Sequence, residues 1–323
     1  MTPRGADGIM KFRFITSALL ALAVGVFAFV VRGDAVSVGA AIAAALGAGL
    51  FVQNRRLLRR RRMDRAPFPD AWRAVLDEYV DFYDGLEGDD QARFERDVRY
   101  FVEEHTIAGP RGIEVEEELK VLVGASAALL SFGQPGYIWE RVRDVIIYPE
   151  AFDDEYVTSS QGNILGQVGR QSSIIFSARA LRQGFAAGDD GLNVGLHEMA
   201  HVLDFDGGPA DGVPSLMPWH AVRGWLNLVH DEVQLIDAHR SVLRQYGATN
   251  EAEFFAVATE AFFERPTQLR KKHPELYAML REAYAQDPAG PSEVDDEGDE
   301  RSPEARRRRR NERKRRQDKK DKR

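Results

Sequence analysis

Two histidines four residues apart flank a glutamate in the segment His197-Glu198-Met199-Ala200-His201. On a helix, positions i and i+4 lie on the same face, so both imidazoles can bind one metal ion. Neutral imidazole is a common zinc ligand, and a catalytic zinc keeps one coordination position for water. Glu198 follows the first histidine and is placed to act on that water as a general base. The segment therefore predicts a metal site with hydrolytic chemistry.

The residues around this motif favour a helix. Asn193 precedes the first apolar positions and is a preferred N-cap residue. Gly207 and Gly208 follow the last apolar positions, where glycine favours helix termination. This context supports a metal-binding helix over the alternative, in which two surface histidines match the motif by chance.

The composition limits the chemistry and the partners of the chain. Its 323 residues suit one or two domains, and 44% hydrophobic residues suffice for a packed core. Cysteine is absent, which excludes disulfides, thiolate metal ligands and a cysteine nucleophile.

The net charge of −7 divides into +8 in residues 1–65, −25 in residues 66–300 and +10 in residues 301–323. Such an acidic body is not expected to bind nucleic acid. The basic tail is either a solvated, disordered end or a tether to anionic lipid or nucleic acid.

The N-terminal region contains two uncharged segments, residues 14–31 and residues 35–52, separated by Arg32-Gly33-Asp34. Each is just long enough to cross a bilayer as a helix, so the pair predicts a transmembrane hairpin. Basic residues stand on both sides of the pair, which predicts that both flanks are cytoplasmic. The predicted location is the cytoplasmic membrane, with the remainder of the chain in the cytoplasm. A signal peptide with one anchor, or a soluble cytoplasmic protein, are the alternatives.

The spacing of apolar residues predicts an α+β domain over residues 66–287, mainly helical with a small mixed sheet. Residues 288–323, acidic and then basic, lack periodic apolar positions and are expected to be disordered. The predicted helices span residues 72–83, 91–104, 115–130, 225–238, 238–246, 250–264 and 274–284. The predicted strands span residues 144–148, 162–170 and 172–177.

A site of this kind needs a third protein ligand. The metzincin pattern requires a glycine and a ligand at the positions that Asp204 and Gly207 occupy, so that class is excluded. The remaining option is a carboxylate from a later helix. Glu253, Glu260 and Glu264 share one face of the predicted helix 250–264 among phenylalanines. Acidic groups in such surroundings are costly to bury without a compensating cation.

Two segments together resemble one known family. His197–His201 with Leu203-Asp204, and later Glu253-Phe-Phe-Ala-Val-Ala-Thr-Glu260, resemble the Mlc titration factor A family of zinc-dependent peptidases. Ile146–Phe152 and Gly207…Gly212-Val-Pro214 also match its pattern, and the resemblance covers roughly residues 67–287. That family is gluzincin-like and similar in its catalytic core to the anthrax lethal factor protease, which implies a zincin-type domain here.

The resemblance implies a role for five residues. His197, His201 and Glu253 would bind one zinc ion, Glu198 would be the general base, and Tyr246 would stabilise the oxyanion. Two of these residues have structural alternatives. Glu253 stands three residues after Asn250 and could instead cap the helix, and Tyr246 could be a core residue.

Other polar residues are candidates for the surroundings of the metal. Asp204 lies on the ligand face of its helix, where it either pairs with a nearby cation or a histidine ring N–H or simply lies at the surface. Thermolysin-like enzymes have an acid four residues after the third ligand, where this chain has Val257, and Glu260 is the substitute candidate. The histidines interpreted as ordinary helix-surface residues are His220, His230 and His239.

The sequence thus predicts a zinc metallopeptidase that acts on a peptide or protein, with aminopeptidase and internal cleavage both open. The alternative is a regulatory binding protein, because the resemblance implies that a family member can sequester a transcriptional repressor. The hydrophobic and basic ends depart from the short soluble members of that family.

Overall fold

The computed structural model describes residues 35–148, 172–186, 188, 190–206 and 211–290. The chain divides into two compact units, Met1–Pro67 and Phe68–Arg323. The polar contacts and buried residues of the metal-binding region all belong to the second unit.

The described part of the first unit is one long helix, α2 (Ala35–Met63). It begins where the second predicted membrane segment begins but continues through the arginines instead of ending near residue 52. Leucine and arginine are good helix formers, and the helix ends shortly before Pro67. No helix in the described residues is both long and apolar enough to cross a membrane. The predicted hairpin therefore receives no support, and its first segment, residues 14–31, lies outside the described residues.

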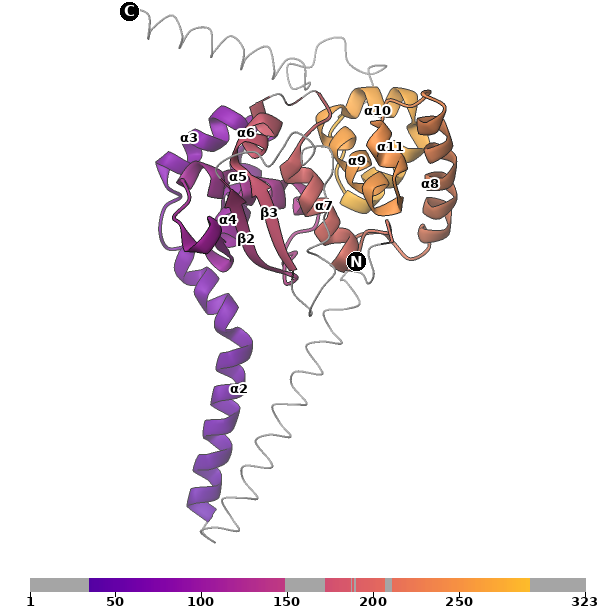
Figure 1. The fold of residues 1–323 in the computed structure, drawn as a ribbon. Coiled ribbons are helices and arrows are strands. Elements are labelled where there is room, and N and C mark those ends of the chain that lie inside the picture. Colours follow the sequence, from indigo (N-terminus) through magenta and orange to yellow (C-terminus); the bar gives the residue numbers. More distant parts are fainter. Residues whose placement is uncertain (1–34, 149–171, 187, 189, 207–210, 291–323) are drawn as a thin grey trace, which may run out of the picture. The chain divides into compact units, whose positions relative to one another are not determined.

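A small parallel sheet stands near the centre of the second unit (Figure 1). Its order is β1 (Thr106–Ala108), β2 (Val142–Tyr148), β3 (Ser172–Ser177). Val145 pairs with Ile174 and Ile147 pairs with Phe176, and these four side chains are buried on one face. The sheet was predicted to be mixed, but every described pairing is parallel. Parallel neighbours need a crossover connection, and a helix supplies it between β1 and β2. The predicted strand 162–170 lies outside the described residues.

Helix α5 (Glu117–Ser131) is the central helix of the second unit. It packs against α3, α4, α6 and α7, and its residues from Val121 to Ser131 are all buried. Small side chains make this close packing possible, since a Cβ at Gly124 would lie 2.9 Å from Val102 Cγ2. The bounds of its neighbours are α3 (Asp70–Tyr79), α4 (Gly88–Glu104), α6 (Ala178–Ala186) and α7 (Val194–Asp206).

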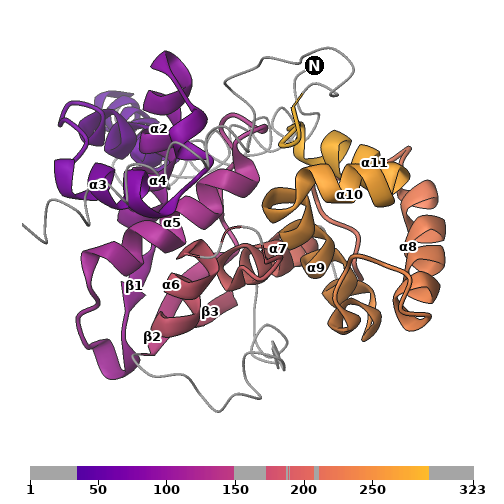
Figure 2. The ribbon, with the colours of Figure 1, turned by 90° about the horizontal axis from the view of Figure 1, so that it is seen from above.

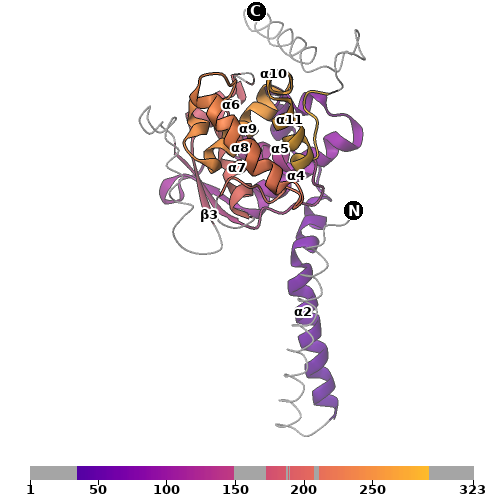
Figure 3. The ribbon, with the colours of Figure 1, turned by 90° about the vertical axis from the view of Figure 1, so that its right-hand side faces the viewer.

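The C-terminal helices form a second group of elements, and α7 lies between this group and the sheet (Figure 2). Figure 3 shows the same helices gathered on one side of the unit. Helix α9 packs against α7, α8, α10 and α11, and its phenylalanines pack against the buried Tyr284. The bounds are α8 (Val222–Asp237), α9 (Glu251–Glu264), α10 (Pro266–Lys272) and α11 (Pro274–Tyr284), with short 3-10 turns η1 (Tyr83–Gly85), η2 (Pro110–Gly112) and η3 (Gln245–Ala248).

The prediction of a mainly helical α+β domain is confirmed. The helix predicted over residues 225–238 is confirmed by α8, which ends at Asp237. The helix predicted over residues 238–246 is wrong, because His239 takes a left-handed backbone with φ 55°. Two further elements were not predicted: strand β1, with three residues, and helix α10, with seven. Both are too short to show a periodic pattern.

Candidate metal centre

Helix α7 presents both histidines of the motif on one buried face. Asn193 begins the helix, because its side-chain oxygen accepts the backbone N–H of Leu196 at 3.1 Å. One turn further along, the rings of His197 and His201 lie 4.9 Å apart, nearly perpendicular to each other. Their Nε2 atoms are 3.2 Å apart, and each residue is 5% exposed. The helix therefore brings two imidazole nitrogens to one point.

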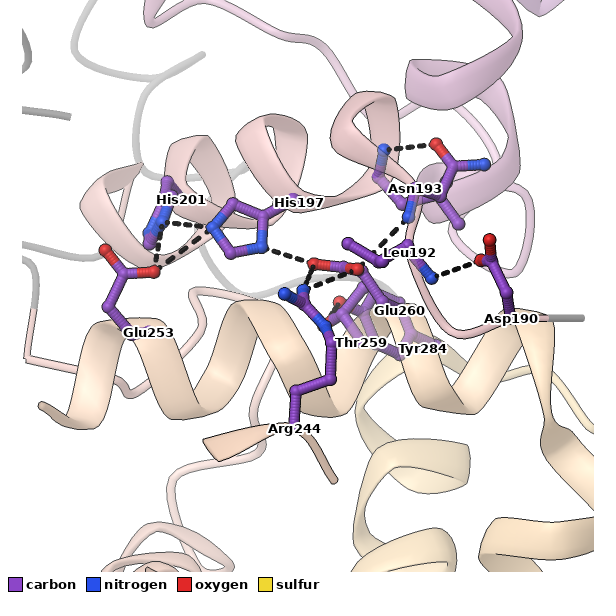
Figure 4. A network of polar contacts seen from close by, with 11 residues as sticks. Asp190, Leu192, Asn193, His197, His201, Arg244, Glu253, Thr259, Glu260 and Tyr284 are labelled. Carbon is purple, nitrogen blue, oxygen red and sulfur yellow. Dashed lines mark hydrogen bonds and ion pairs between the residues drawn. The ribbon is translucent and has the colours of Figure 1, made fainter. Parts of the chain in front are cut away.

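Helix α9 brings Glu253 to the same point (Figure 4). Its Oε2 lies 3.1 Å from His197 Nε2 and 3.4 Å from His201 Nε2. In the described residues, these three are the group of side chains that could hold a metal ion. Tetrahedral ligands with bonds of 2.0–2.1 Å lie about 3.3–3.4 Å apart, close to the three distances found here. The donor set thus fits a small cation with one coordination position left open.

Glu253 does not serve only as a helix cap. Asn250 is the N-cap of α9, and its side chain accepts the backbone N–H of Glu253 at 2.9 Å. The side chain of Glu253 turns away from the cap, toward the two histidines. The backbone N–H of Glu253 therefore takes part in the helix cap, while its carboxylate lies beside the two histidines.

Glu260 lies two turns further along α9 and contacts the other side of His197. It is 1% exposed, and one of its oxygens accepts a short hydrogen bond from His197 Nδ1. It also accepts the backbone N–H of Asn193 at 3.1 Å and contacts Arg244 Nη2 at 2.6 and 2.8 Å. Because Nδ1 donates to Glu260, the Nε2 lone pair of His197 points to the metal position.

The charges of the cluster attract a cation. Burial alone would lower the pKa of the His197 imidazole, but the carboxylates of Glu260 and Glu253 outweigh it and raise that pKa to about 10. Burial alone would raise the pKa of Glu253, but hydrogen bonds from His197 and His201 hold it at about 2. Positive charge is therefore strongly favoured between these side chains, as a proton or as a metal ion.

Glu198 and Tyr246 lie beside the cluster without belonging to its three donors. Glu198 is half-buried; burial raises the pKa of its carboxyl above the ordinary value, and His197 and His201 only partly counteract this. Tyr246 belongs to η3, and its ring lies 6.1 Å from the ring of His197. The fold thus brings both predicted catalytic residues to the region of the metal ligands.

Asp204 is fully buried, so its predicted alternative as a surface residue is wrong. Its Oδ2 accepts the backbone N–H of Gly212 at 3.0 Å, while Oδ1 has no hydrogen-bond partner among the described residues. Burial raises the pKa of its carboxyl to about 6. The carbonyl of Gly212 in turn accepts Trp225 Nε1 at 2.7 Å. Asp204 therefore ties the segment after α7 to the helix.

Two contacts of the site have no signal in the sequence. Arg244 reaches Glu260 from the segment before η3, and Asn193 donates from its side chain to Glu264 at 3.1 Å in addition to capping α7. Both contacts join segments far apart in the chain. The one feature of the sequence that suggests a place near the site for Arg244 is its position two residues before Tyr246. The histidines predicted to lie on helix surfaces, His220, His230 and His239, are all exposed. Of these three, His230 lies in a helix, α8, whereas His220 and His239 lie in turns.

Comparison with known proteins identifies the family. The model of the glucose-regulated metallo-peptidase M90 family matches residues 54–285, which is well over half of the chain. The chain belongs to this family. The uncharacterized protein slr2042 of Synechocystis sp. is 28% identical over 244 residues, covering 71% of this chain and 89% of that protein.

Relatives named Mlc titration factor A are similar over a comparable span. The protein of Cronobacter sakazakii is 32% identical over 244 residues, covering 69% of this chain and 88% of its own length. That of Salmonella arizonae is 31% identical over 221 residues, covering 63% of this chain and 86% of its own length. The predicted family is thereby confirmed, and this M90 family member has a metallopeptidase-like domain.

Proposed function

We propose that this M90 family member is a zinc-dependent peptidase whose catalytic domain spans residues 66–287. The observation that carries the proposal is the convergence of His197, His201 and Glu253 at distances suited to one tetrahedral ion. Its family supports peptide hydrolysis as the reaction class. When bound, the metal would polarise the substrate carbonyl and lower the pKa of water.

Zinc is the proposed ion because the three donors suit it and because Glu198 lies beside them. Two imidazoles and one carboxylate also suit non-haem iron(II), so the donor set alone does not separate these metals. Glu198 adds a carboxylate next to the ligands. Hydrolysis requires such a group as a general base, whereas a site that only binds a metal does not. Elemental analysis of protein purified without added metal should therefore find one zinc per chain.

The proposed reaction assigns two steps to protein side chains. Glu198 takes a proton from the attacking water and delivers it to the leaving amine. The raised pKa of its carboxyl suits this double role, because the group must bind and release a proton near neutral pH. The Tyr246 hydroxyl donates a hydrogen bond to the oxyanion that forms at the carbonyl.

Replacement of Glu198 by Gln tests the proposal. Glu198→Gln should retain stoichiometric zinc and lose turnover of a mixed-sequence peptide library by at least about a hundredfold, since general-base catalysis contributes that much. Mass spectrometry of the products would also distinguish removal of terminal residues from internal cleavage. Glu251→Gln is the matched control, because Glu251 is an exposed glutamate at the start of α9. Wild-type turnover by Glu198→Gln would reject the general-base role.

A regulatory binding function is the second candidate. Several relatives carry the name Mlc titration factor A, which describes binding of Mlc by those proteins. If this chain acts mainly by such binding, purified Mlc should co-sediment with wild type and with Glu198→Gln to the same extent. Turnover of the peptide library would then be absent from both proteins. Turnover by wild type alone supports the peptidase instead.

A further inference from the structure

Arg244 connects two parts of the site that lie on different elements. Its side chain extends from the segment before η3 to Glu260 on α9 (Figure 4). One nitrogen, Nη2, contacts both carboxylate oxygens at 2.6 and 2.8 Å. The Glu260 side chain is almost completely buried, whereas the Arg244 side chain is partly exposed. A charged contact of this kind is among the stronger hydrogen bonds in a protein.

Glu260 is held by three donors, two of which come from α7 and its N-cap residue. The backbone N–H of Asn193 and the ring of His197 fix the carboxylate to the metal helix. Arg244 is the third donor and the one that comes from the η3 segment. The Glu260 carboxylate therefore contacts both the His197 ring and the segment that contains η3.

The η3 segment is short and begins directly after Arg244. The carbonyl of Arg244 accepts the backbone N–H of Gly247 at 3.0 Å, which closes a turn around Tyr246. Gly247 lies close to α9, where an added Cβ would be 3.3 Å from Val257. Gln245 donates to the carbonyl of Ile236 at 2.9 Å. The turn also packs against α8 and α9. The clamp between Arg244 and Glu260 adds a charged attachment of this turn to α9.

We propose that Arg244 is a positioning residue, which places Tyr246 over the metal site by attaching the η3 turn to Glu260. The role of Tyr246 toward the oxyanion rests on the proposed function. The contact between Arg244 and Glu260 is present in the fold whether or not the protein is a peptidase. Because a displacement of about 1 Å can reduce a rate by about a hundredfold, loss of the clamp should mainly lower kcat.

The first experiment does not depend on catalysis. Hydrogen exchange of the full chain would be compared between wild type, Arg244→Met and Arg240→Met. Arg240 is an exposed arginine four residues earlier, so its replacement removes the same charge from the same segment. Arg244→Met should increase exchange in residues 241–248 at least tenfold, while residues 251–264 exchange as in wild type. Unchanged exchange in residues 241–248, or an equal increase in Arg240→Met, would overturn the clamp.

The second experiment separates positioning of Tyr246 from orientation of His197. With the peptide library as substrate, Arg244→Met should lower kcat about tenfold to a hundredfold with KM within about threefold of wild type. Arg244→Lys, which keeps a charged donor, should recover part of the loss. In a Tyr246→Phe background, Arg244→Met should cause no further loss of kcat.

Zinc affinity, measured by competition with a chromophoric chelator, completes the test. It should change less than tenfold in Arg244→Met, because His197 keeps its bond to Glu260. A loss of tenfold or more, with additive effects of Arg244→Met and Tyr246→Phe on kcat, would mean that Arg244 acts through His197 and would overturn the proposal. If wild type itself turns over no peptide, the proposed function fails, whereas the exchange experiment still decides on the clamp.

Discussion

The metal helix α7 depends on a glycine that allows it to lie against α5. Gly195 stands two residues before His197, and a Cβ added there would lie 2.2 Å from Ser126 Oγ. It would also lie 3.1 Å from Asn193 Oδ1 and from Leu181 Cδ1. Ordinary contact between carbon and oxygen needs about 3.2 Å, so either α7 or Ser126 must move by about 1 Å. We therefore predict that Gly195→Ala disturbs both stability and metal binding.

The expected size follows from two opposing effects. Overpacking of a core costs about 1–3 kcal/mol, and replacement of glycine by alanine inside a helix returns up to about 1 kcal/mol. The net loss should be about 1–2 kcal/mol, or a decrease of about 2–8 °C in Tm for a unit of this size. A shift of α7 would also move His197 relative to Glu253, and the three ligand distances of 3.1–3.4 Å leave little tolerance. Zinc affinity should fall at least tenfold.

The assay compares four proteins by calorimetry and by chelator competition: wild type, Gly195→Ala, Ser126→Ala and the double variant. Ser126→Ala removes the clashing oxygen and, among the described residues, loses one hydrogen bond, to the carbonyl of Leu122 in the same helix. The double variant should therefore recover most of the Tm and zinc affinity that Gly195→Ala loses. Gly224→Ala in α8 is the control, since its Cβ would meet only the flexible end of Met279. Wild-type behaviour of Gly195→Ala, or no recovery in the double variant, would refute this account of the packing.

Three further variants test single residues of the site. Glu253→Ala should lose stoichiometric zinc in elemental analysis, and unchanged metal content would move the third ligand elsewhere, first to Glu260. Tyr246→Phe should lower kcat about a hundredfold with metal content unchanged, and wild-type turnover would make Tyr246 a packing residue. The carboxyl of Asp204 has a pKa of about 6 in the folded chain, above its ordinary 3.8, so its ionisation reduces the free energy of unfolding as pH rises from about 4 to about 6. Asp204→Asn should remove this loss, which is about 3 kcal/mol. The measurement is the free energy of unfolding of wild type and Asp204→Asn, from urea titrations with chelator at pH 4 and pH 7. The same difference between the two proteins at both pH values would contradict the prediction.

The sequence predicted those parts of the site that local chemistry determines. Asn193 as a cap defines the start of the metal helix, and the observed α7 begins directly after it. The predicted stop at Gly207 lies outside the described residues. The shared face of Glu253, Glu260 and Glu264 follows from helical spacing alone, and all three carboxylates face α7 in the structure. Helix periodicity and capping are visible in a single segment, so these features could be read from it.

The remaining features depend on how distant segments meet. The contact between Arg244 and Glu260 requires that the chain turn back after α8, and that turn depends on the left-handed conformation of His239, which is uncommon for a residue other than glycine. Burial of Asp204 likewise depends on Gly212, eight residues later, whose N–H it accepts. Nothing in the spacing of apolar residues indicates either event.

The three glutamates of α9 also have a consequence for how two helices align. They are spaced by seven residues and then by four, and they meet in order the ligand histidines, the far side of His197, and the N-cap Asn193. If α9 slid by one turn, Glu264 would take the place of Glu260, but Val257 would replace Glu253 beside the histidines. At least one buried carboxylate would then lack its partner, at a cost of several kcal/mol. The unequal spacing therefore selects a single register between α7 and α9, so residues suited to hold a metal also reject misaligned packing.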